Sequence, residues 1–149
     1  MPDAERTPEP YAPGDPELRS ILGRSKTIAI VGLSSNPDRY SFEVASYLRG
    51  KGYRIVPVNP NENEVLGERA YASLLDIPSE ICIDAVDVFR RAEETPEVAR
   101  QAVSIGARVL WLQNDIVNDE ARHLAEEGGL EVVMGVCMMS THRRLSREG

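Results

Sequence analysis

Residues 26–32, KTIAIVG, are the feature that most constrains how this chain can fold. They form an apolar, β-branched run that ends in glycine. A run without alternating polar residues is typical of a strand covered on both faces, as in a parallel sheet. Because neighbouring parallel strands are joined by crossover connections, usually helices, a helix and a second strand should follow. Residues 41–50 read as the helix, with Ser41 as its expected cap, and residues 53–58 as the strand.

The rest of the chain continues this alternation. The periodicity predicts an α/β fold: a doubly wound, three-layer sandwich with a mostly parallel central sheet. Residues 65–74 are expected to form a short edge strand that leads into one helical turn. Further strands are predicted over 81–89, 108–113 and 130–135, and further helices over 15–23, 95–105 and 118–127.

The N-terminal stretch differs from the remainder in composition. Five of the ten prolines lie in the first sixteen residues, with little apolar surface to bury, so we predict a flexible tail over residues 1–14 and a single domain over 15–149. The net charge of −7 argues against nucleic-acid partners. No apolar run is long enough for a membrane helix, and two cysteines are too few for a disulfide framework. These observations favour a cytoplasmic protein with reduced thiols.

The junction after the first strand, residues 32–41, has the composition of a phosphate-binding loop. Gly32 permits a tight turn, and Ser34, Ser35 and Ser41 offer donors at the start of the predicted helix. Arg39 supplies a guanidinium that can hold a phosphate by two hydrogen bonds. The loop matches neither G-x-G-x-x-G nor a P-loop, so a capped loop with an exposed arginine is the alternative.

The end of the second predicted strand bears on which cofactor is bound. Units that bind NAD usually place an acidic residue there to accept a hydrogen bond from the ribose. This chain has Val58, Asn59 and Pro60 instead, and no carboxylate until Glu62. An apolar rim suits the face of an adenine, so NAD is disfavoured but stays open.

Five segments resemble the stand-alone CoA-binding domain proteins. These segments are IAIVGLSSNPDR, GYRIVPVNPNENEVLGERAYASLLDIP, DAVDVFR, GARVLWLQ and CMMSTHRRL, in that order between about residues 21 and 145. The family is similar to the N-terminal CoA-binding domain of the succinyl-CoA synthetase alpha subunit. The resemblance implies a Rossmann-like fold with coenzyme A as its ligand.

The resemblance also implies where the coenzyme lies. Its phosphates would be held by the loop after the first strand, and residues at the end of the second strand would border its adenine. Other residues would line the crest of the sheet, the edge formed by the carboxyl ends of its strands. The loop residues are Gly32, Leu33, Ser34, Ser35, Arg39 and Ser41; the adenine border is Val58, Asn59 and Pro60; the crest is Phe89, Arg90 and Gln113.

The C-terminal segment departs from the family pattern at two places. The family often has Asp-Arg or Asn-Arg before the cysteine and Glu before the histidine, whereas this chain has Gly135-Val136 and Thr141. A structural ion pair or a pocket charge is therefore missing. These departures leave open a protein-interaction scaffold that has lost its ligand.

Other polar residues give no catalytic or metal constellation. His123 and His142 have no partners at metal-ligand spacing. Asp84 and Asp87 lie three apart on a predicted strand and should point to opposite faces, and Asp87 is expected to anchor loop N–H groups. Cys82 is expected in the core. Cys137 is interpreted as a small buried residue, with a mixed disulfide to the CoA thiol as the alternative.

We therefore expect a module that binds coenzyme A or an acyl-CoA at the carboxyl ends of the strands without transforming it. It would have no metal and no membrane partner, and it could form a homodimer. Three alternatives remain beside the scaffold: an NAD(P)-binding oxidoreductase, a subunit of an enzyme that handles acyl-CoA, and a thiol-redox module that uses Cys137.

Overall fold

Five parallel strands form the centre of the protein. The computed structural model describes residues 9–148. The strands β1 (Thr27–Val31), β2 (Arg54–Val58), β5 (Ala85–Val88), β6 (Val109–Leu112) and β7 (Glu131–Met134) lie in the order β2-β1-β5-β6-β7. Every neighbouring pair is parallel. The predicted sheet is therefore confirmed, and it is parallel throughout.

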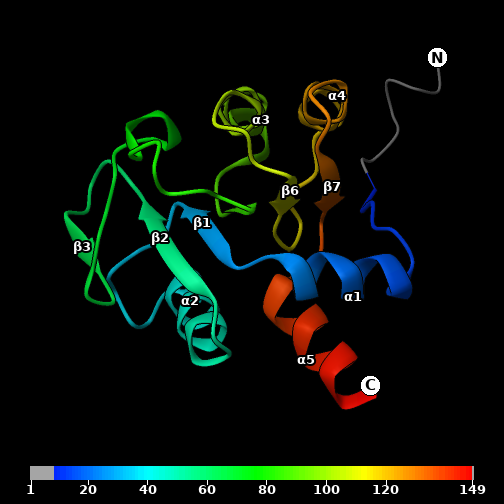
Figure 1. Cartoon of the computed structure of the whole chain (residues 1–149), viewed down its shortest axis with the longest axis horizontal. Coiled ribbons are helices and arrows are strands. Elements are labelled where there is room, and N and C mark those ends of the chain that lie inside the picture. The colour runs from blue at the N-terminus through cyan, green and yellow to red at the C-terminus, as the bar shows by residue number, and fades with distance from the viewer. Residues whose placement is uncertain (1–8, 149) are drawn as a thin grey trace.

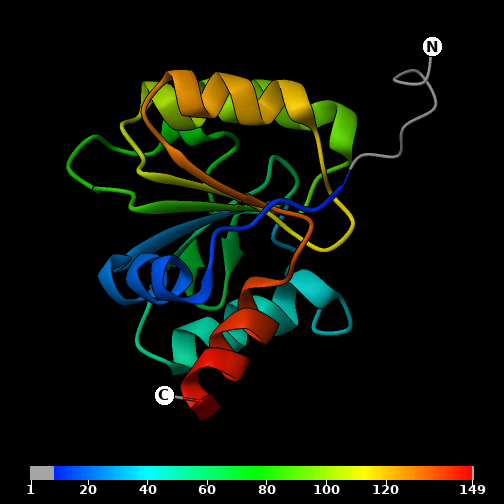
Figure 2. The same ribbon diagram turned by 90° about the vertical axis from the view of Figure 1, so that its right-hand side faces the viewer.

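Helices cover both faces of this sheet, as Figures 1 and 2 show. On one face lie α1 (Asp15–Arg24), α2 (Tyr40–Gly50) and α5 (Met138–Glu148), and on the other α3 (Thr95–Ser104) and α4 (Asp119–Glu127). Two buried apolar clusters fill the two interfaces; Ile28, Ile30 and Trp111 belong to the first, and Val86, Leu110 and Leu112 to the second. This is the doubly wound three-layer sandwich that the alternation predicted.

The strand order changes direction between β1 and β5. From β1 the chain first moves outward to β2, then returns across β1 to place β5 on its other side and continues to β6 and β7. The two crossovers leave a crevice beyond the carboxyl ends of β1 and β5, where ligands bind in open α/β sheets. Gly32 follows β1 and Phe89 follows β5, so these residues mark the crevice.

Three segments differ from the sequence prediction. Residues 138–148 form helix α5, which the apolar pattern did not predict. Instead of an edge strand after residue 64, two short strands, β3 (Glu64–Val65) and β4 (Glu68–Arg69), form a hairpin outside the main sheet, followed by the 3₁₀ turn η2 (Leu74–Asp76). Strand β5 begins only at Ala85, so Cys82 lies in the connection before it and is exposed. The expectation of a core position for Cys82 is wrong.

The predicted tail is attached to the sheet at one point. Tyr11 forms an antiparallel bridge with Met134, with its N–H 2.9 Å from the Met134 oxygen and its oxygen 2.8 Å from the Met134 N–H. The rest of the predicted tail up to residue 8 lies outside the described residues. No helix between residues 9 and 148 combines the length and apolarity that a bilayer-spanning segment requires.

Candidate functional site

A cleft of about 440 Å³ opens at the switch in strand order. Its walls are the loop after β1, the first turn of α2, the chain after β2 and the end of β5. Six of the twelve predicted site residues line it, together with three that sequence analysis did not assign there. The predicted ones are Gly32, Ser34, Arg39, Ser41, Asn59 and Phe89, and the additional ones are Tyr40, Asn61 and Glu62.

Gly32 brings the loop close to the neighbouring strand. Its φ is +88°, and a Cβ placed on it would lie 2.3 Å from the carbonyl oxygen of Phe89. Its N–H donates to the Val58 oxygen at 2.7 Å. Any side chain here would therefore push the loop away from β5 and open the base of the cleft.

The loop serines are partly engaged with each other. Ser41 does not cap α2, as the sequence suggested. The helix begins at Tyr40 with Arg39 as its N-cap, and the Ser41 hydroxyl oxygen accepts from the Ser34 N–H at 3.1 Å. The Ser34 hydroxyl oxygen accepts from the Asn36 N–H at 3.0 Å. These bonds fold the loop back onto the first turn of α2, whose N-terminal end faces the cleft.

Glu62 is the residue of the cleft that sequence analysis left without a role. Its carboxylate Oε2 accepts from the Ser35 N–H at 2.9 Å and from the Ser35 hydroxyl at 3.0 Å. The contact joins the loop after β2 to the loop after β1. The Glu62 carboxylate thus already accepts hydrogen bonds from two donors that the sequence predicts to bind phosphate. Only the late appearance of a carboxylate after β2 signalled it in the sequence.

Arg39 lies at the mouth of the cleft. Its side chain is exposed, and its backbone oxygen accepts from the N–H groups of Phe42 and Glu43 at 3.1 and 3.2 Å as the helix begins. Within residues 9–148 its guanidinium has no recorded ion pair or side-chain hydrogen bond. It is therefore available to an anionic ligand.

The end of β2 is divided between two cavities. The Asn59 amide nitrogen donates to the Leu33 oxygen at 3.0 Å, so this side chain braces the loop after β1. Leu33 is fully buried and offers only its backbone. Val58, Pro60 and Arg90 line a second cavity of about 440 Å³, which α3 borders on the opposite face of the sheet. The predicted site residues therefore do not share one pocket.

Gln113 lies beneath the crest rather than on it. It is 1% exposed, and its Oε1 accepts from the Met138 N–H at 3.0 Å. This bond holds the first turn of α5 against the end of β6. Its Nε2 is buried and has no hydrogen-bond partner. The prediction that Gln113 lines the crest is therefore wrong for the conformation described here.

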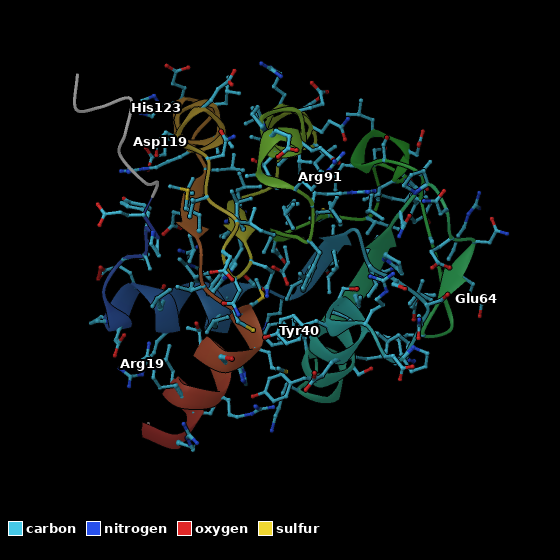
Figure 3. All side chains as sticks on the ribbon, turned by 180° about the vertical axis from the view of Figure 1, so that it is seen from behind. Arg19, Tyr40, Glu64, Arg91, Asp119 and His123 are labelled. Carbon is cyan, nitrogen blue, oxygen red and sulfur yellow. The ribbon has the colours of Figure 1, made fainter. Side chains whose placement is uncertain are left out.

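Cys137 precedes α5 and contacts the first residue of α2. The Tyr40 hydroxyl lies 2.6 Å from the Cys137 sulfur, and the Ser140 N–H lies 3.4 Å from it. Burial raises the pKa of the Cys137 thiol, but hydrogen bonding with Tyr40 and Ser140 outweighs burial and lowers it below its ordinary value. Burial and the same contact raise the pKa of Tyr40 to about 12. Figure 3 labels Tyr40 beside the start of α5.

Asp87 lies below this contact, inside the sheet. It is fully buried, and neither of its carboxylate oxygens has a hydrogen-bond partner. The expected anchoring of loop N–H groups is therefore wrong. Burial, followed by the charge of Cys137, raises the pKa of Asp87 well above its ordinary value. Among residues 9–148, no group of three or more His, Cys, Asp or Glu side chains is placed to hold a metal ion.

Comparisons with known proteins give a family match and a shared fold. The family model described as "CoA binding domain" matches residues 26–143. "Uncharacterized protein YneT" of Bacillus subtilis is 44% identical over 130 residues, which cover 87% of this chain and 95% of that protein. A solved structure, "hypothetical protein from Pyrococcus horikoshii OT3", has a TM-score of 0.87 and 42% identity, and covers 95% of this chain and 99% of that one.

One group of relatives is much longer. "Acetate--CoA ligase [ADP-forming] II" of Archaeoglobus fulgidus is 29% identical over 113 residues, 74% of this chain. The match spans only 16% of the ligase. The chain thus corresponds to one part of a larger protein in these relatives and to nearly a whole protein in the others.

Proposed function

Since the chain belongs to the CoA binding domain family, we propose that it binds coenzyme A or an acyl-CoA across the carboxyl ends of β1, β2 and β5. The observation that carries the proposal is the cleft at the switch in strand order. There the N-terminal end of α2, the Ser34 hydroxyl and the unpaired Arg39 guanidinium face one space. This donor set suits a pyrophosphate, because helix N-termini and arginine forks both favour phosphate oxygens.

The Glu62 side chain must move before the phosphates can bind. Its carboxylate holds Ser35 and would repel a pyrophosphate in the same cleft. The coenzyme therefore displaces the Glu62 side chain from Ser35 as it binds. The N–H and hydroxyl of Ser35 then donate to a phosphate oxygen instead of to Glu62. The loop therefore has the same number of hydrogen bonds with and without the coenzyme.

The adenine is proposed to lie over Pro60 beside the second cavity. Pro60 is exposed and Val58 lies beneath it, while Arg90 borders the same cavity. Asn59 turns its amide to the Leu33 oxygen, and no carboxylate projects from the end of β2 itself. A ribose diol therefore lacks the acceptor that NAD-binding units provide, and this observation favours CoA over NAD.

We propose a binding or regulatory module rather than an enzyme. The ligases among the relatives are several times longer than the matched segment. The described residues that line the cleft include Arg39, Tyr40 and Glu62 but no histidine or cysteine. The second candidate is a subunit that presents CoA to a catalytic partner, which the likeness to one part of the ligases favours.

Calorimetric titration with CoA, NADH and NADPH in parallel tests the ligand class. We expect CoA to bind with the lowest Kd. Tighter binding of NADH would contradict the proposal and indicate an oxidoreductase. The titration uses the full chain, so that residues before residue 9 are included.

A further inference from the structure

A buried polar cluster lies next to the cleft, and no role in phosphate binding explains it. It consists of Tyr40, Asp87, Gln113 and Cys137, which we call the thiol cluster. Asp87 is 0% exposed and Gln113 is 1% exposed, yet both carboxylate oxygens of Asp87 and the Nε2 of Gln113 have no hydrogen-bond partner. Native proteins rarely leave three such atoms unpaired, because burial removes their hydrogen bonds to water.

The unpaired atoms lie near one sulfur. The Gln113 side chain reaches the start of α5, where its Oε1 accepts from the Met138 N–H at 3.0 Å, next to Cys137 in the chain. The charge of Cys137 acts on Asp87, so the carboxyl also lies in its neighbourhood. Together they offer an unpaired NH2 group and a carboxyl that can donate or accept. These are the groups needed to pair with an amide, and the pantetheine arm of CoA contains two amides and ends in a thiol.

Tyr40 separates the thiol cluster from the phosphate cleft. Its ring lines the cleft and packs edge-on against Phe89, with ring centroids 6.2 Å apart. Its hydroxyl covers the Cys137 sulfur at 2.6 Å, and Cys137 is 4% exposed. Tyr40 itself is 41% exposed. A rotation of this one side chain toward solvent opens the Cys137 sulfur to the cleft without moving a buried group.

We propose that Cys137 forms a mixed disulfide with the thiol end of coenzyme A bound in the cleft. The proposal rests on the proposed binding of CoA. Phosphates held at the start of α2 direct the pantetheine arm past Phe89, where its amide meets Gln113 and Asp87. Cys137 precedes the eleven-residue helix α5, whose N-terminal end favours a thiolate over a thiol.

The co-reactant is a CoA disulfide, and the step is an exchange. The Cys137 thiol loses its proton to solvent, and the thiolate attacks the sulfur of the CoA half that lies in the cleft. The sulfur–sulfur bond of the CoA disulfide breaks as the bond to Cys137 forms. The second CoA leaves as a thiolate and takes a proton from solvent. One disulfide replaces another, so no further oxidant is needed.

Intact-mass spectrometry of the reduced full chain after incubation with CoA disulfide tests the exchange. We expect one added CoA per chain, released by dithiothreitol and mapped to Cys137. Cys137→Ser should lose the adduct and Cys82→Ser should keep it. Cys82 serves as the internal reference because it is exposed and lies outside the thiol cluster. Glutathione disulfide, which lacks the nucleotide, should modify Cys137 at least tenfold more slowly.

A second variant examines the role of Tyr40. Tyr40→Phe keeps the ring but removes the hydroxyl that holds it over the sulfur, so the ring should rotate away more easily and adduct formation should speed up several-fold. An unchanged rate would remove Tyr40 from the mechanism.

The outcomes separate this proposal from CoA binding itself. An adduct on Cys82 at the same rate as on Cys137, or no adduct on Cys137 although CoA still binds in the calorimeter, would overturn the disulfide and leave CoA binding intact. Absence of both binding and adduct would overturn the two together.

Discussion

Ser35 and Glu62, 27 residues apart in the chain, are joined by two hydrogen bonds to one carboxylate oxygen. Glu62 Oε2 lies 2.9 Å from the Ser35 N–H and 3.0 Å from its hydroxyl. A carboxylate in this place resembles a bound phosphate oxygen. In the proposed binding mode this internal anion occupies part of the phosphate site, and we expect the strength of its contact with Ser35 to help set the affinity for CoA.

Glu62→Gln is expected to bind CoA more tightly. The amide keeps the shape of the side chain but removes a negative charge from the cleft, which is worth roughly 1 kcal/mol at a partly exposed site. The Kd from calorimetry should fall about three- to tenfold. Glu64→Gln, on the neighbouring hairpin (Figure 3), makes the same charge change outside the cleft and should have a smaller effect. Weaker binding by Glu62→Gln would show that Glu62 contacts the coenzyme favourably.

Arg39→Ala is expected to weaken CoA binding. The guanidinium has no ion-pair partner among residues 9–148, and a charge-assisted hydrogen bond contributes roughly 1.5–3 kcal/mol. The Kd should rise by about one to two orders of magnitude, with little change in thermal stability. Arg100→Ala on α3, which removes an exposed ion-paired arginine, is the matched control. Equal affinities for the two variants would exclude Arg39 from the site.

Gly32→Ala is expected to damage both stability and binding. The new Cβ meets the Phe89 oxygen, and the left-handed backbone adds about 1–2 kcal/mol of strain. Gly52→Ala separates these effects, because Gly52 has a φ of +100° but nothing within 4 Å of the Cβ position. Chemical denaturation should show a larger loss for Gly32→Ala, and calorimetry should show lost CoA binding in that variant alone. Similar losses of CoA binding in both variants would mean that the close approach of Gly32 to Phe89 is not needed for binding.

The stability of Asp87→Asn relative to wild-type should increase as the pH rises. The pKa of Asp87 is raised by burial in the folded state and lies near 3.9 when unfolded. Below about pH 4 the carboxyl is protonated in both the folded and the unfolded protein, so it adds no pH dependence to the stability of wild-type. Above that pH the unfolded chain loses the proton first, and the free energy of unfolding falls until the folded pKa is passed.

The size of this effect is measurable by urea denaturation at several pH values between 4 and 7. Where the carboxyl is charged only in the unfolded state, the stability difference between Asp87→Asn and wild-type should grow by about 1.4 kcal/mol per pH unit. A difference that is independent of pH would show that Asp87 is ionised in the folded protein.

The sequence predicted the sheet well because buried parallel strands leave a strong pattern. The runs that end near Gly32, Val58 and Gln113 are mainly apolar, and the helices between them have clear boundaries. Helix α5 was missed because residues 138–148 begin with two methionines and carry three arginines. Its position depends on tertiary contacts, such as the bond from the Met138 N–H to Gln113.

The site was predicted less completely than the fold. The loop after β1 could be recognised, because glycine, serines and an arginine at a strand–helix junction have a local meaning. The contact of Glu62 with Ser35 and that of Tyr40 with Cys137 join residues 27 and 97 positions apart. No local sequence pattern indicates contacts between residues so far apart in the chain. For the same reason the sequence could not show that Pro60 and Arg90 lie at a different cavity from Arg39.

Thermal unfolding of the full chain with increasing CoA tests the central claim most directly. A ligand that binds only the folded state adds about 2.7 kcal/mol at a concentration of 100 times its Kd, which corresponds to a rise in Tm of about 5–11 °C for a chain of this size. We predict a Tm that rises with the logarithm of the CoA concentration and rises less with NADH. A Tm that stays constant up to millimolar CoA would contradict the account.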